Sequence, residues 1–141
     1  MLDPENPQVF WGFGAVMSGR GKLPQAIEYL ETAREHWSGG EGVVPLLADL
    51  GTLRSAYAAS LPADRELERA QAFISANQSF AESLELNPNY ARSWREWALS
   101  LYDQGRFSEA WLKAGRAQDL KADPFPADFL SKLKQKVGES K

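Results

Sequence analysis

Only a few short stretches of this 141-residue chain carry residue types at a spacing that could do chemistry. The stretch GRGK at 19–22 has the glycine and lysine of a phosphate-binding loop. That loop, however, needs Gly where Val16 stands and Ser or Thr where Leu23 stands. The GFG at 12–14 lacks the third glycine of a dinucleotide-binding motif. A turn between two helices explains GRGK better, and we expect no cofactor.

The titratable residues offer no set suited to catalysis or to metal binding. His36 is the single histidine and the chain has no cysteine, so thiolate metal sites and disulfides are excluded. Glu28, Glu31 and Glu35 recur at helical spacing, which is typical of a solvated helix face rather than of an acid–base pair. We therefore expect a protein that is not an enzyme and that has no metal site.

Composition and charge narrow the class of protein further. Apolar residues make up 43% of the chain and charged residues 25%, as in an ordinary globular domain. The net charge of −3 and the lack of a basic block argue against nucleic acid as a partner. The sequence shows neither a signal peptide nor an apolar run long enough to span a membrane. We expect a soluble protein, and the compartment stays open between the cytoplasm and the bacterial periplasm.

Two segments of the chain repeat one spacing of small residues among large ones. Gly14 precedes Ala26 by 12 residues, and Ala98 precedes Ala110 by the same 12. Small residues at such positions let two antiparallel helices approach closely, while the large residues fill the space between layers. The spacing therefore predicts a helix hairpin near each end of the chain.

This pattern resembles the tetratricopeptide repeat, whose signature is a large residue, Leu-Gly, an aromatic residue, then Ala and Phe with a closing Pro. The matching motifs are Phe10-x2-Phe13-Gly14, Trp94-x2-Trp97-Ala98 and a weaker middle copy, Leu47-x2-Leu50-Gly51, that closes with Leu86-Asn87-Pro88. The resemblance implies a single all-α domain, a right-handed solenoid of antiparallel helix hairpins with about three repeats. We place the repeats at 7–40, 43–88 and 91–122, followed by a capping helix at 126–137.

The middle repeat is longer than the other two. Its interval from Gly51 to Ala76 is 25 residues, which is 13 more than in the flanking repeats. Pro62 stops the first helix of this repeat, and no Pro or Gly interrupts the run from Asp64 to Leu86. We therefore expect the insertion to lengthen the second helix, with about three extra turns projecting beyond the stack.

The resemblance also implies a function, because tetratricopeptide repeats bind a partner peptide or helix in the concave groove lined by the first helix of each repeat. Carried over by position, the groove residues are Gln8, Trp11, Ala15, Asp49, Thr52, Arg92, Arg95, Glu96, Leu99 and Tyr102. This lining suits a partner with an apolar anchor near Trp11 and an acidic group near the arginines. The alternative for Arg95 and Glu96 is pairing with neighbouring side chains on a solvated face.

The family's two-carboxylate clamp, which holds chaperone C-terminal tails, is a poor match. The clamp needs Lys and Asn on the first helix, Asn on the second, and Lys and Arg on the third. Of the residues at the corresponding positions, Trp11, Ala15, Asp49, Arg92 and Glu96, only Arg92 is compatible. We do not expect chaperone tails to be the ligand.

Two other functions remain open at this point. The stack could be a structural spacer or assembly element of a larger protein that uses the extended helix of the middle repeat. It could also be the regulatory domain of a fused enzyme.

The first residues of the chain have the register of a repeat boundary. Leu2 precedes Gly14 by 12 residues, as Leu86 precedes Ala98, so residues 2–7 correspond to 86–91. We therefore expect the chain to be a fragment with at least one more hairpin or cap upstream. The uncapped first repeat would then allow weak homodimerisation.

Overall fold

The structure is a computed structural model that describes residues 6–139, and this part of the chain contains seven α helices and no strand. The helices are α1 (Pro7–Gly19), α2 (Leu23–Glu35), α3 (Val43–Ser60), α4 (Glu66–Leu86), α5 (Ala91–Asp103), α6 (Phe107–Asp119) and α7 (Phe129–Glu139). The predicted all-α solenoid is confirmed. Most of the predicted repeat boundary at residues 2–7 lies outside the described residues.

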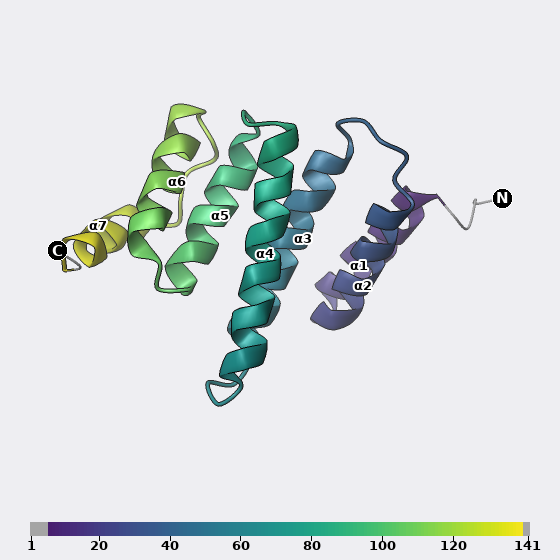
Figure 1. Cartoon of the computed structure of the whole chain (residues 1–141), viewed down its shortest axis with the longest axis horizontal. Helices are drawn as coiled ribbons and strands as arrows, with labels where there is room; N and C mark the ends of the chain where they lie inside the picture. Colours follow the sequence, from purple (N-terminus) through teal and green to yellow (C-terminus); the bar gives the residue numbers. More distant parts are fainter. Residues whose placement is uncertain (1–5, 140–141) are drawn as a thin grey trace.

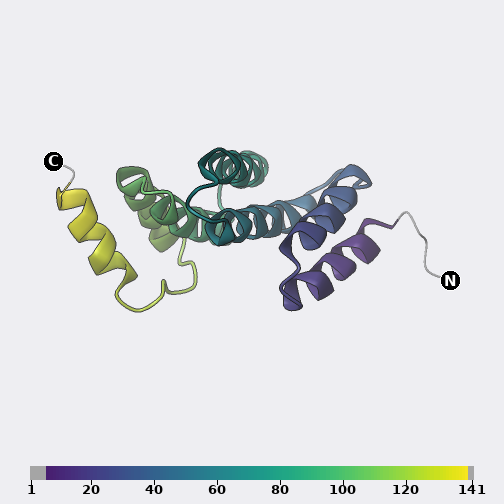
Figure 2. The ribbon, with the colours of Figure 1, turned by 90° about the horizontal axis from the view of Figure 1, so that it is seen from below.

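The helices pack as three successive hairpins in a row, with α7 at the far end (Figure 1). α2 packs on α3, and both helices of the second hairpin pack on α5. Viewed at right angles, the row is bowed: α1 and the α6–α7 connection lie on one side of it and α4 lies on the other (Figure 2).

Small residues sit where the paired helices cross. Gly14, Ala26, Ala98 and Ala110 are all buried. A Cβ atom at Gly14 would lie only 3.1 Å from the backbone oxygen of Ala26 and would collide with Leu30. Close approach of α1 and α2 therefore depends on the missing side chain.

The middle hairpin is long in both of its helices. α3 has 18 residues and α4 has 21, whereas each helix of the two flanking hairpins has 13. α3 runs as far as Ser60, close to the stop expected at Pro62, so the first helix of this hairpin is long as well as the second. The joined ends project from the row (Figure 1).

α7 covers the apolar side of the last hairpin. Phe129 and Leu133 are buried in one cluster with Leu101 and Ala114. The helix begins at Phe129 rather than near 126, because Asp128 adopts a left-handed conformation with φ of 67°. None of the helices within residues 6–139 is long and apolar enough to cross a membrane.

Candidate functional site

Three of the predicted groove residues, each from the first helix of a different hairpin, are joined by hydrogen bonds. Asp49 of α3 accepts from the indole Nε1 of Trp11 on α1 at 2.8 Å. Its other carboxylate oxygen accepts from the guanidinium of Arg92 on α5, as a salt bridge. Burial alone would lower the pKa of Arg92, but the hydrogen bond and charge of Asp49 outweigh it and raise that pKa. Arg92 is therefore held in its charged form.

A cavity of about 280 Å³ lies between α1 and α3, beside this bridge. Buried Leu30 and half-buried Leu53 contribute its apolar surface. The remaining lining residues are Trp11, Ala15, Ser18, Asp49 and Thr52. The Thr52 hydroxyl is buried and has no hydrogen-bond partner within the described part of the chain. Four of the predicted residues therefore line one hollow.

Trp11 forms a wall of this cavity rather than a freely projecting side chain. Its ring packs edge-on against Trp37, with 5.9 Å between the ring centroids. It also packs against the buried cluster that contains Leu30 and Leu47. Because its N–H is used by Asp49, Trp11 can offer a ligand only its apolar surface. Gln8, by contrast, is exposed at the start of α1 and does not line the cavity.

The other half of the predicted groove is covered by the chain itself. We call residues 122–128, which connect α6 to α7, the strap. Arg95 donates through Nε to the backbone oxygen of Asp123 at 3.1 Å and through a terminal nitrogen to that of Pro124 at 2.9 Å. The same guanidinium pairs with Glu96 at 2.8 Å and lies 5.7 Å from the centre of the Phe125 ring. Arg95 is thus bound by its own chain: its pairing with Glu96 matches the alternative that the sequence left open, whereas its contacts with the strap were not expected.

Leu99 and Tyr102 belong to the packing beneath α7. Both pack against the cluster that contains Phe129. The Tyr102 ring lies 5.3 Å from the Phe107 ring and 5.3 Å from the Phe129 ring. The two residues therefore support the end of the groove rather than line an open part of it. The signal that could have revealed the strap is the Pro124-Phe125-Pro126 sequence, an extended segment with one aromatic ring.

The described residues hold no arrangement that suits metal chemistry. Within residues 6–139 no three His, Cys, Asp or Glu side chains are grouped so that they could bind a metal ion. His36 places its Nδ1 2.9 Å from the backbone oxygen of Thr32 and its ring against Phe10. The histidine thus lies in local helix contacts.

Comparison with known proteins gives a match in structure. No protein-family model matches the chain, and no curated protein matches it. Among solved structures, the chain is similar to the first tetratricopeptide-repeat domain of Spaghetti (RPAP3) bound to the HSP90 peptide SRMEEVD. The two superpose with a TM-score of 0.71 and 14% sequence identity, over 99% of this chain and 96% of the other.

This chain has the tetratricopeptide-repeat fold. The match spans nearly the whole length of both chains, so it includes the long middle hairpin and the terminal helix. At 14% identity the likeness shows the fold alone. The side chains of this chain's own groove must therefore decide what the tetratricopeptide-repeat fold binds here.

Proposed function

We propose that the protein is a non-catalytic interaction module that binds a partner peptide or helix at the α1–α3 cavity of its concave groove. The observation that carries the proposal is the cavity itself, which is lined by Trp11, Ala15, Asp49 and Thr52. A concave, mostly apolar hollow with a few polar atoms is the usual form of a ligand site. The neighbour in structure is a domain bound to a peptide, which supports a peptide as the ligand class.

The cavity suits one apolar side chain of a partner. Its apolar surface comes from Leu30, Leu53, Ala15 and the Trp11 ring, and its polar rim comes from Asp49. Arg92 lies beside this rim and is 44% exposed, whereas Arg95 is 20% exposed and bound to the strap. An acidic group of the partner would therefore meet Arg92 rather than Arg95. The HSP90 peptide of the neighbour is not expected to bind here, because only Arg92 matches the carboxylate clamp.

A peptide-display experiment tests the proposal. Peptides are selected from a phage-displayed random library on the unaltered chain, and their affinities are then measured against two tryptophan variants. Ala15 is an exposed residue of α1 that lines the cavity, so the large ring of Ala15→Trp fills the cavity. Ala81→Trp places the same ring at an exposed position of α4 outside the cavity. We expect the selected peptides to lose at least about tenfold in affinity for Ala15→Trp and none for Ala81→Trp. Equal affinity for the two variants would contradict the proposal.

Thr52→Val gives a second, sharper readout. The substitution keeps the shape of the side chain but removes the buried hydroxyl that lacks a partner. Removing an unsatisfied polar atom should stabilise the free protein by about 1 kcal/mol. Because the hydroxyl is buried, a ligand in the cavity meets only the rest of this side chain, whose shape valine keeps, so peptide affinity should not change. A rise in unfolding free energy with unchanged affinity is the expected pair of results, measured by urea unfolding and by titration.

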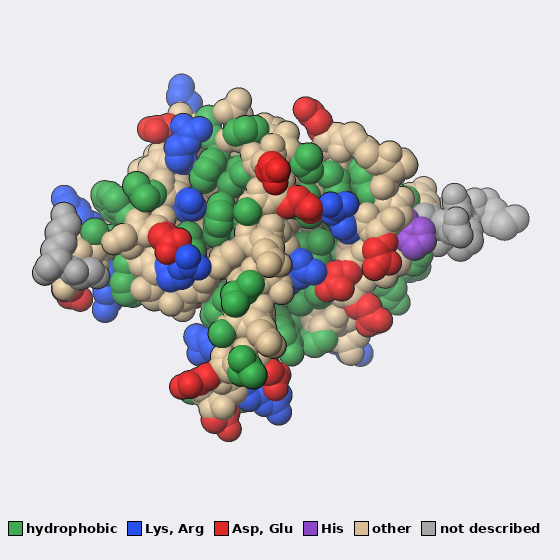
Figure 3. All heavy atoms as spheres, viewed as in Figure 1, with side chains coloured by type: hydrophobic (Ala, Val, Ile, Leu, Met, Phe, Trp, Pro, Cys, Tyr) green, Lys and Arg blue, Asp and Glu red, His purple; other side chains and the backbone are tan. Residues whose placement is uncertain are grey.

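A second candidate is an assembly role for the projecting end of the middle hairpin. Leu67 is 73% exposed and Ile74 is 54% exposed on α4. Figure 3 shows acidic, basic and hydrophobic side chains together on this projection. A cleft of about 410 Å³ lies between the start of α4 and the α5–α6 turn. If this surface makes the partner contact, Leu67→Asp should abolish partner binding while Ala15→Trp leaves it unchanged.

Weak self-association through the first hairpin is also proposed. Phe13 and Val16 are both large, apolar and about half exposed on the outer side of α1. Apolar side chains that remain in water favour association, since burying them is favourable. Sedimentation velocity at increasing protein concentration should show a dimer that Val16→Asp removes. A single monomeric species at every concentration would contradict it.

A further inference from the structure

The strap lies on the same face of α5 as Arg92, whose salt bridge with Asp49 borders the open half of the groove. Arg92 binds Asp49 across the groove, and Arg95, one helical turn further along α5, binds the strap. The α6–α7 connection is on the side of the bowed row where α1 lies (Figure 2). The groove is therefore divided into an open half at α1 and α3 and a covered half at α5.

The contacts that hold the strap are those that would hold an extended peptide. Pro124 and Pro126 favour an extended backbone, which leaves the carbonyl oxygens of the segment available. The Arg95 guanidinium binds two successive carbonyls, of Asp123 and Pro124. One aromatic side chain, Phe125, anchors the segment by stacking on Phe129 with ring centroids 5.0 Å apart. Main-chain recognition plus one aromatic anchor is a general mode of peptide binding.

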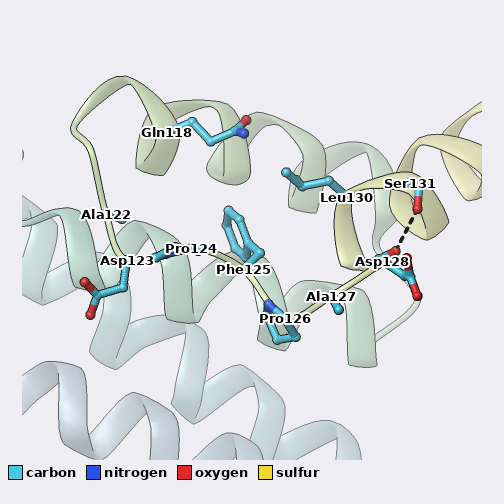
Figure 4. A pocket seen from close by; sticks show the side chains of 10 residues that line it. All are labelled: Gln118, Ala122, Asp123, Pro124, Phe125, Pro126, Ala127, Asp128, Leu130 and Ser131. Carbon is cyan, nitrogen blue, oxygen red and sulfur yellow. Dashed lines mark hydrogen bonds between the residues drawn. The ribbon is translucent and has the colours of Figure 1, made fainter.

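Two further features indicate that a few contacts hold the strap in place and that it is not closely packed along its whole length. Lys121 and Asp128, just before the strap and at its last position, have φ of 59° and 67°, a left-handed conformation that costs free energy for residues other than glycine. A hollow of about 580 Å³ is lined by the strap, by Gln118 of α6 and by Leu130 of α7 (Figure 4). The Phe125 ring reaches into this space in Figure 4. The contacts of Arg95 and Phe125 must therefore offset a strained and loosely packed connection.

We propose that the strap is an intramolecular occupant of the α5 half of the groove, which a long partner segment must displace. The α5 half then takes an extended segment with an aromatic side chain between two prolines, the chemistry of the strap itself. This inference rests on the proposed function, since it assigns the second half of the same groove. A short partner binds only at the α1–α3 cavity, whereas a longer one gains the Arg95 contacts after the strap leaves.

The test uses a fluorescein-labelled peptide with the strap's own sequence, KADPFPA (residues 121–127), titrated against the full chain by fluorescence anisotropy. The unaltered chain should not bind it, because the tethered strap acts at an effective concentration on the order of millimolar. A strap variant with Asp123→Gly, Pro124→Ser, Phe125→Gly and Pro126→Ser should bind it at least about tenfold more tightly. Adding Arg95→Ala to the strap variant should remove this binding. Phe13→Ala is the matched control, because it removes an exposed phenylalanine elsewhere and should not create binding.

Three outcomes overturn the inference. Equal binding to the unaltered chain and the strap variant would show that the strap does not occupy the peptide's place. Absence of binding to a folded strap variant would show that α5 does not take such a segment. The single variant Phe125→Ala is measured in parallel in case the four changes undock α7, and no gain in a folded Phe125→Ala chain also overturns the inference. None of these outcomes concerns binding at the α1–α3 cavity, which Ala15→Trp tests separately.

Discussion

The two junctions between successive hairpins are built from different interactions. At the second junction, α3 and α4 both pack on α5. The Phe80 ring of α4 stacks on Trp97 of α5 with 6.3 Å between ring centroids, and the buried hydroxyls of Ser83 and Ser93 lie 2.8 Å apart. Apolar packing with satisfied buried polar groups makes this junction a rigid unit.

The first junction also has an apolar core, a cluster of buried side chains of α2 and α3 that includes Leu30 and Leu46, but its edges are polar and hollow. α1 faces α3 across the cavity of about 280 Å³, and a further cavity of about 350 Å³ is lined by α2, α3 and α4. Salt bridges span this region, from Arg34 to Glu82 at 2.8 Å and from Arg54 to Glu31 at 3.1 Å. Half-exposed ion pairs are weak and sensitive to salt. The two junctions therefore differ at their edges: cavities and half-exposed ion pairs border the first, whereas aromatic stacking and buried hydroxyl pairs are found at the second.

The largest effect is expected from breaking the second junction at Phe80. The side chain is the largest of the fully buried ones in residues 6–139, and it packs at the second junction. Phe80→Ala removes that packing and leaves a cavity, so the free energy of unfolding should fall by about 3–5 kcal/mol. Urea unfolding followed by circular dichroism measures the loss. Phe13→Ala on the outer side of α1 should cost far less, because that ring is already 48% exposed.

A smaller loss is expected from adding one carbon at Gly51 of α3, the helix shared by both junctions. A Cβ atom there would lie 2.6–2.8 Å from three carbons of the Phe80 ring, which is buried and has no room to move. Gly51→Ala should therefore destabilise the chain by about 1–3 kcal/mol. Gly115→Ala on α6 is the matched control, since no atom lies within 4 Å of its added carbon. Alanine has a higher helix propensity than glycine, so Gly115→Ala should raise the free energy of unfolding by up to about 1 kcal/mol. Equal effects at the two glycines would contradict the clash expected at Gly51.

The ion pair of the first junction should contribute less again. A double-mutant cycle with Arg34→Ala and Glu82→Ala is expected to give a coupling free energy of about 0.2–1 kcal/mol, because both side chains are 41% exposed. The coupling should shrink at high salt. Ser83→Ala provides the contrast at the second junction, because it removes a buried hydroxyl that is hydrogen-bonded to Val44 and Ser93. The free energy of unfolding should fall by about 1–2 kcal/mol, and salt should not change this loss. If the coupling free energy of Arg34 and Glu82 exceeded the loss caused by Ser83→Ala, the polar contact at the first junction would be the stronger of the two.

The sequence predicted the repeat geometry because that geometry depends on local spacing. The 12-residue intervals from Gly14 to Ala26 and from Ala98 to Ala110 mark helix crossings that the structure places in the core. The seven helices and the turns between them follow from the same local signals. Pro62 also marked the end of α3 at Ser60, but the interval from Gly51 to Ala76 drew attention to the second helix, although α3 is itself longer than the helices of the flanking hairpins.

The candidate site was predictable only in part. Register alone placed Trp11, Asp49 and Arg92 on one face, and the structure joins them by hydrogen bonds. The contacts of Arg95 with the strap cross 28 residues of sequence. The segment that makes them ends at Asp128, whose left-handed conformation composition does not reveal. Contacts of that kind come from tertiary structure rather than from periodicity.

The smallest effect is expected at the polar rim of the second junction, where Asp103 at the end of α5 faces Arg69 at the start of α4. Burial raises the pKa of Asp103 above its ordinary value, and the charge of Arg69 opposes that rise. The folded chain therefore holds this proton more tightly than the unfolded chain does, so stability falls as the pH rises from the ordinary pKa through the raised one.

Asp103→Asn removes this titration. The free energy of unfolding is measured against pH for both chains. The value for the unaltered chain minus that for the variant should fall by a small step as the pH rises. Urea midpoints measured from mildly acidic to neutral pH give the two profiles, and Asp119→Asn at an exposed position of α6 is the matched control. A step of opposite sign would mean that the attraction of Arg69 outweighs burial. The second junction would then be held at its rim by an ion pair, as the first junction is, and the two junctions would no longer differ at their rims.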